Sequence, residues 1–279
     1  GLLAWGGGGI KKSIEFTGGT EINATFSAQP VPGQITGALD KLGIKDSRVV
    51  LAEGNHAFVT TSAIKDSDRL KVQQAIEGLG SKVESLSNVN GAISAELTKN
   101  AILSVLYASV LIILFLALRF SIPNFVEGLK FGTCAVIALL HDVLVLWGSF
   151  AILGFVLNWQ IDSLFVTAML TVIGFSVHDT IIIFDRIREN LRHRQRGELF
   201  DGVADRSIEQ TFTRSIYTSG TVVLTLLAML ILGGPVVKLF VAALLIGIVS
   251  GTYSSIFNAT PLLVLWKRMS GDTMAASTA

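Results

Sequence analysis

The sequence predicts an α-helical polytopic membrane protein with one small external α+β domain of the ferredoxin-like type. Hydrophobic residues make up 51% of the 279 residues and charged residues only 15%. The mean hydropathy is +0.61. A bilayer core about 30 Å thick is crossed by about 20 mostly apolar residues in a helix. Five stretches are long and apolar enough, at residues 101–118, 131–153, 163–184, 215–237 and 239–265.

The distribution of lysine and arginine predicts how the chain is oriented. Arginines crowd the segment between the third and fourth spans, and the C-terminal end carries Lys267 and Arg268. Because short cytoplasmic segments are enriched in these residues, we expect both regions in the cytoplasm. The predicted parts are a stub at 1–13, an external domain at 14–98, a transmembrane domain at 99–268 with a cytoplasmic loop at 185–214, and a cytoplasmic tail at 269–279.

The stub opens with Gly1–Trp5 and four glycines, which is neither an initiator methionine nor a signal peptide. We interpret residues 1–13 as the remnant of a truncated first transmembrane segment and its linker.

The external region has the sequence pattern of a split β-α-β-β-α-β unit. Its second predicted helix, 68–79, carries Leu70 and Ile76 among its apolar residues and Gly80 as its C-cap. Without a catalytic constellation, the region is expected to act as a binding or lever module. The other elements are a strand at 14–27 with a kink at Gly18-Gly19, a helix at 34–42, two strands within 48–61 around the turn Glu53-Gly54-Asn55, and a strand at 82–87.

Several functional classes are disfavoured by composition and motifs. The net charge of +1, without a basic cluster interleaved with aromatics, argues against nucleic acid as a partner. The sequence contains neither a GxxxxGK[ST] loop nor a metal-binding His or Cys spacing, so we expect no cofactor, no metal and no enzymatic activity. The single cysteine, Cys134, lies inside a span and is expected to be a buried hydrophobe.

Asp179 is the strongest candidate for a functional residue. It lies in an otherwise apolar stretch, residues 172–184, where an ionisable group costs about 2.5–3.5 kcal/mol to insert. Such groups usually face a partner or a wet cavity on an ion or substrate path. The two interpretations are a proton-binding carboxylate and a structural carboxylate tied to a neighbouring helix.

Arg214 is the candidate counter-charge for Asp179. It heads a polar stripe continued by Thr218, Thr221 and Thr225 on an otherwise apolar helix. The alternative is an anchor whose charged end reaches the membrane surface.

Secondary candidates are Asp142, His141 and His178. The dipeptides His141-Asp142 and His178-Asp179 do not suggest a metal site, because neighbouring helical residues diverge by about 100°. In the last span, Gly247 and Gly251 form a GxxxG spacing that permits close helix packing.

Four motifs occur in order along the chain. They are Phe16-Thr17-Gly18-Gly19-Thr20, ALLHDV at 138–143, IGFSVHDT at 173–180 running into FDRIREN at 184–190, and RSIYTS at 214–219. Together they resemble the SecF family, the smaller half of the bacterial SecD–SecF protein-export complex and a relative of the resistance-nodulation-division transporters. The chain departs from the family in having five spans rather than six, and in having Glu15 where the first motif usually has Asp.

The resemblance implies a subunit of the bacterial inner membrane that uses the proton-motive force to help pull or release translocating polypeptide on the outer face. It implies that Arg214 belongs to the proton path with Asp179. The implied partners are SecD, as a separate or fused chain, the SecY–SecE–SecG channel, often YajC, and unfolded preprotein. Two alternatives stay open, namely a small-molecule proton antiporter and a passive scaffold that stabilises the channel.

Overall fold

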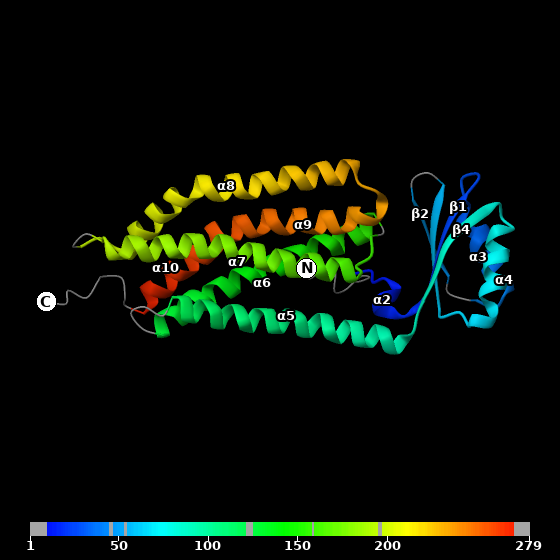
Figure 1. Ribbon diagram of the computed structural model, residues 1–279, viewed down its shortest axis with the longest axis horizontal. Helices are drawn as coiled ribbons and strands as arrows, with labels where there is room; N and C mark the ends of the chain where they lie inside the picture. The colour runs from blue at the N-terminus through cyan, green and yellow to red at the C-terminus, as the bar shows by residue number, and fades with distance from the viewer. Residues whose placement is uncertain are drawn as a thin grey trace. The chain divides into compact units, whose positions relative to one another are not determined.

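The computed structural model describes residues 10–44, 47–52, 55–120, 125–157, 159–194 and 197–270 (Figure 1). Most of the predicted stub at 1–13 and of the tail at 269–279 lies outside these residues. The chain divides into two compact units. The first comprises Lys11–Ile102 and Gly154–Ser163 and is called the external unit after its predicted side of the membrane. The second, the helical unit, comprises Leu103–Leu153 and the chain from Leu164 onward.

The external unit contains a four-stranded antiparallel sheet with the order β2-β3-β1-β4. Helices α3 and α4 lie on one face of this sheet (Figure 1). Between them lies a core that includes Ile22, Leu39, Val59 and Ile76, all fully buried. The predicted α+β class and element order are confirmed. The elements are β1 (Gly19–Phe26), α3 (Pro32–Lys41), β2 (Arg48–Ala52), β3 (His56–Thr61), the short helix η1 (Asp66–Asp68), α4 (Arg69–Glu77) and β4 (Ser81–Val89).

The predicted strand at 14–27 is wrong in its first part. Ile14–Thr17 forms a helical turn, α2, and β1 begins only at Gly19. Gly18 and Gly19 have φ angles of 74° and 127°, which side-chain-bearing residues rarely adopt. A β-carbon at Gly19 would also overlap the carbonyl oxygen of Thr61. The two glycines therefore change the chain direction between α2 and the sheet, where a kinked strand was expected.

The predicted apolar face of α4 is also corrected. Val72 and Ile76 are fully buried, four residues apart, whereas Leu70 is 70% exposed. Leu70 precedes Val72 by two residues and so lies on another side of the helix. The helix ends at Glu77 with Gly78 as its C-cap, two residues before the expected Gly80. Residues 53 and 54 of the predicted turn lie outside the described residues, and Asn55 has a left-handed φ of 62°.

Five helices of the described chain are long and apolar enough to cross a membrane, as the sequence predicts. The last of them contains a π-helical segment, η2, so that α9, η2 and α10 form one continuous span. Helix α8 lies beside α9 (Figure 1). The bounds are α5 (Gly91–Arg119), α6 (Phe125–Val156), α7 (Ser163–Arg192), α8 (Phe200–Leu232), α9 (Pro235–Ser254), η2 (Ser255–Ala259) and α10 (Thr260–Met269).

The segment expected as a cytoplasmic loop is largely helical. Helix α7 continues to Arg192 and α8 already begins at Phe200, so helices cover most of residues 185–214. The side chain of Asn190 donates a hydrogen bond to Ser207 Oγ at 2.8 Å, which joins the two helices beyond the apolar stretch. At the other end, α8 stops at Leu232 and not at 237, and α9 starts with Pro235, a residue favoured in the first turn of a helix.

Aromatic packing holds three helices of the helical unit together. The ring of Phe120 stacks on Phe131 at 5.2 Å, and both rings meet Phe184 of α7 edge-on. Gly132 lets α6 approach α5, because its β-carbon position lies 3.2 Å from the carbonyl oxygen of Ile113. Cys134 is fully buried, as predicted.

Candidate functional site

Asp179 lies in the interior of the helical unit and is only weakly hydrogen-bonded. Its side chain is 1% exposed. Oδ2 accepts long hydrogen bonds from Ser219 of α8, at 3.3 Å, and from Thr252 of α9, at 3.4 Å. Thr252 Oγ1 also lies 2.6 Å from Ser219 Oγ, so its single hydroxyl hydrogen cannot serve both acceptor oxygens fully. Oδ1 has no hydrogen-bond partner among the described residues.

Asp142 of α6 is equally buried but fully hydrogen-bonded. Its Oδ2 accepts hydrogen bonds from Ser176 of α7 at 2.6 Å and from Ser254 of α9 at 2.7 Å. Its Oδ1 accepts one from Ser250 at 2.9 Å, and His141 Nδ1 lies 3.3 Å from the same oxygen. Hydroxyl donors on both oxygens stabilise the ionised form of a carboxylate. Asp142 thus links α6 to α7 and α9.

The two buried aspartates therefore differ in chemistry although their sequence contexts are alike. Each follows a histidine in an apolar span. Asp142 is surrounded by donors, whereas Asp179 has one free oxygen that can take a proton without loss of a hydrogen bond. The acid–base role of a carboxyl group depends on such differences in its environment.

A close contact between α7 and α9 brings these polar groups together. A β-carbon at Gly247 would overlap the Val172 side chain, and one at Gly251 would lie 2.9 Å from Ser176 Cβ. Only glycine allows this approach. Farther along the same contact, Thr180 and Ser255 share a hydrogen bond of 2.9 Å. The consecutive residues Ser254 and Ser255 therefore bond to different helices, Ser254 to Asp142 of α6 and Ser255 to Thr180 of α7. The helix becomes π-helical at this point.

Arg214 does not contact Asp179. Its side chain is exposed, and among the described residues it forms no ion pair. The threonines of the predicted stripe are exposed as well, and their hydroxyls bond to carbonyls of their own helix.

The polar stripe that α8 buries is offset by one residue from the predicted one. It consists of small polar residues at every fourth position and includes Ser219, the partner of Asp179. Ser219 and Thr252 were not among the predicted site residues. The four-residue spacing of the α8 stripe was a visible signal for Ser219, and Thr252 of α9 had no such signal. Its members are Ser207, Thr211, Ser215 and Ser219.

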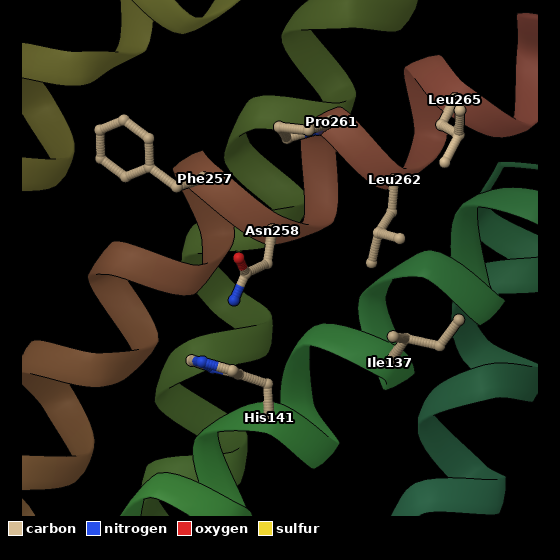
Figure 2. Close-up of a pocket in the computed structure, with 7 residues that line it drawn as sticks. All are labelled: Ile137, His141, Phe257, Asn258, Pro261, Leu262 and Leu265. Carbon is tan, nitrogen blue, oxygen red and sulfur yellow. The ribbon is translucent and has the colours of Figure 1, made fainter.

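The secondary candidates lie at different places. His178 is exposed on α7. The side chain of His141 is 41% exposed and lines a pocket between α6 and the η2–α10 segment (Figure 2). Among the described residues, no group of three His, Cys, Asp or Glu side chains could hold a metal ion.

The first sequence motif lies in the external unit, where it connects α2 to β1. The hydroxyl of Thr20 is buried, accepts a hydrogen bond from the backbone N–H of Ile64 at 3.0 Å and donates one to Asn88. Thr17 donates to the carbonyl of Ser13. Just before Phe16, the carboxylate of Glu15 accepts a hydrogen bond from the backbone N–H of Ser163 at 2.6 Å.

Comparison with known proteins decides the family. Residues 71–269 match the family described as "Protein export membrane protein SecD/SecF, C-terminal". The chain belongs to the SecD/SecF family. The resemblance drawn from the four motifs is confirmed, and the SecD/SecF match includes both buried aspartates.

Individual relatives show how far the similarity extends. The chain is 42% identical to the protein translocase subunit SecF of Thermobaculum terrenum, over 93% of this chain and 85% of that protein. It is 37% identical to SecF of Anaerolinea thermophila, over 96% and 88%. The crystal structure of SecDF from Thermus thermophilus, described as a translocon-associated membrane protein, matches 92% of this chain with a TM-score of 0.82 and 32% identity. This chain spans about a third of that SecDF chain, 34% of its length.

Proposed function

We propose that the protein is an accessory subunit of the Sec export machinery that couples the proton-motive force to work on translocating polypeptide. In this proposal it lies in the bacterial inner membrane, with residues 14–98 on the outer face and the C-terminus in the cytoplasm. It would act with SecD beside the SecY–SecE–SecG channel, with YajC, and on unfolded preprotein that the external unit helps to pull or release. The SecDF form of the Thermus relative supports SecD as the first partner.

The single observation that carries the proposal is the free oxygen of Asp179. This carboxylate is 1% exposed, accepts two long hydrogen bonds and has one oxygen without a partner among the described residues, so it can change its protonation state at little structural cost. Moving one charge through 100 mV releases about 2.3 kcal/mol, enough to shift a two-state equilibrium about 50-fold. One protonatable aspartate is therefore sufficient as a coupling site.

We propose Arg214 as the cation that acts with Asp179. Arg214 lies little more than one helical turn before Ser219, which donates to Asp179. Because its side chain is exposed, the coupling requires a further arrangement of α8 or a partner helix against this face. A lysine there would restore only part of the function, since an ammonium group lacks the planar fork of donors of a guanidinium.

Translocation into inverted membrane vesicles, with and without a proton gradient, tests the assignment of Asp179. We expect Asp179→Asn to lose gradient stimulation and keep basal translocation, because the amide fills the same space and cannot change charge. Asp185→Asn is the matched control, since Asp185 lies on the same helix but is exposed and paired with Arg119 at 2.8 Å. Full stimulation of the Asp179→Asn variant would refute the proton site and leave the passive scaffold.

The same assay tests Arg214 through a double-mutant cycle of Asp179→Asn and Arg214→Ala. If the two residues are coupled, the losses of gradient stimulation are not additive in the double variant. We also expect Arg214→Lys to restore only part of the stimulation lost in Arg214→Ala. Additive losses together with a silent Arg214→Lys would identify Arg214 as a membrane-surface anchor.

A further inference from the structure

The pocket beside His141 contains two polar side chains, those of His141 and Asn258. It has a volume of about 390 Å³ between α6 and the η2–α10 segment. Figure 2 shows the Asn258 amide directed toward the His141 ring, among apolar neighbours that include Phe257 and Leu262. Asn258 has no side-chain hydrogen bond within the described part of the chain, and His141 has none there except the contact with Asp142.

The pocket is lined mainly by apolar side chains, and His141 and Asn258 are its polar ones. Its volume leaves room for several waters beside these two side chains, since each water takes about 30 Å³ in the liquid. His141 lies near the middle of α6. Because it lines the pocket and also contacts Asp142, it connects the pocket to this buried carboxylate.

The Asp142 carboxylate contacts hydroxyl groups and one imidazole ring. Three serine hydroxyls already stabilise the ionised carboxylate, from Ser176, Ser250 and Ser254. The described side chains from other helices that bond to Asp142 or share the pocket of His141 are uncharged, so the carboxylate is the one anion in contact with the ring. An imidazolium paired with it would neutralise a buried charge.

We propose that His141 and Asp142 form a second proton-binding unit, distinct from Asp179. His141 Nδ1–H donates to Asp142 Oδ1, and Nε2 takes up a proton from water in the pocket and returns it there. The carboxylate stays ionised throughout. The link of this unit to export rests on the proposed function, whereas its proton binding does not.

Nitrogen-15 NMR of the four histidines tests the proposal in the full chain, labelled in the imidazole rings and reconstituted in lipid nanodiscs. The His141 signal, assigned by His141→Gln, should change from neutral ring to imidazolium between about pH 8 and pH 5. At the alkaline end the neutral ring should carry its proton on Nδ1, because that nitrogen donates to Asp142. This tautomer needs no variant for its detection.

A variant tests the role of the carboxylate. Asp142→Asn should lower the proton affinity of His141 about tenfold, the effect of losing an opposite charge at contact distance. Asp185→Asn should leave it unchanged. A His141 ring that stays neutral over the range, that carries its proton on Nε2, or that keeps its affinity in Asp142→Asn would overturn the proposal. These signals are read without translocation, so they stand or fall separately from the assignment of Asp179.

Discussion

At the residue scale, the surroundings of Glu21 in the external unit disfavour its negative charge. Partial burial, and to a smaller extent the nearby carboxylates of Glu15 and Asp162, raise the pKa of Glu21 above its ordinary value. A carboxyl group with a raised folded-state pKa favours folding below its unfolded-state pKa and loses that contribution as the pH rises through the folded-state value. The external unit is thus destabilised by Glu21 at neutral pH.

We expect Glu21→Gln to stabilise the external unit at pH 7 and to have little effect at pH 4. The amide cannot ionise, so it removes the repulsion and the desolvation cost that act only on the charged form. Hydrogen exchange of the β1 and β3 amides in the full chain measures the difference. Glu77→Gln, at an exposed site on α4, is the control. Equal effects of Glu21→Gln at both pH values would contradict the prediction.

Sequence reasoning located the ionisable residues of the spans but not their neighbours. Asp179 could be singled out because a carboxylate in an apolar stretch is costly wherever it points. Two polar stripes run along α8, one headed by Arg214 and one that includes Ser215. Which of them is buried depends on the side of α8 that packs against other helices, and in a membrane both sides can be apolar. Whether Asp142 and Asp179 are well or poorly hydrogen-bonded depends on serines and one threonine from neighbouring helices.

At the scale of the elements, the contact between α7 and α9 depends on two glycines. Replacement of Gly247 by alanine would force a β-carbon into Val172. Overpacking of this kind costs about 1–3 kcal/mol. Because Thr252 and Ser254 follow on the same helix, a displaced α9 would also loosen both aspartate sites.

We therefore expect Gly247→Ala to lower the thermal stability of the full chain in detergent, measured by circular dichroism. Gly220→Ala on α8 is the matched control, since nothing lies within 4 Å of its β-carbon position and alanine favours a helix over glycine by up to about 1 kcal/mol. The double variant Gly247→Ala/Val172→Ala should recover part of the loss. The contact would be unimportant if Gly247→Ala were as stable as Gly220→Ala.

Element types could be predicted from the sequence more completely than element ends. Hydropathy identifies each span because the apolar stretch must match the bilayer thickness. It says nothing of where a helix stops once it leaves the apolar region, so α7 and α8 extend into the arginine-rich segment beyond the expected boundaries. The π-helical segment η2 ends just before Thr260-Pro261, and proline lacks the backbone N–H that a regular helix uses, so the sequence does indicate an irregular turn at this point.

At the scale of the whole molecule, the two units have separate cores. The buried cluster of the external unit lies entirely between Ile22 and Ile76. Its attachment to the segment 154–163 is local: Ser13 donates to the carbonyl of Ile161 at 2.9 Å, and Glu15 accepts from Ser163. The hydrogen bonds involve α2 and its flanks, and the carboxylate of Asp162 also acts on Glu21 of β1, so loss of that segment should release α2 and leave the buried core of the sheet in place.

We expect a fragment of residues 12–98 to fold on its own, with a cooperative thermal transition by circular dichroism. Its β1 and β3 amides should be protected from hydrogen exchange, whereas those of α2 should exchange rapidly because the fragment lacks residues 154–163. Leu39→Ala, in the core, should destabilise the fragment by about 2–5 kcal/mol. Leu70→Ala, on the exposed side of α4, should change its stability by less than about 0.5 kcal/mol. A non-cooperative melt, or equal effects of the two leucine substitutions, would mean that the external unit needs the rest of the chain in order to fold.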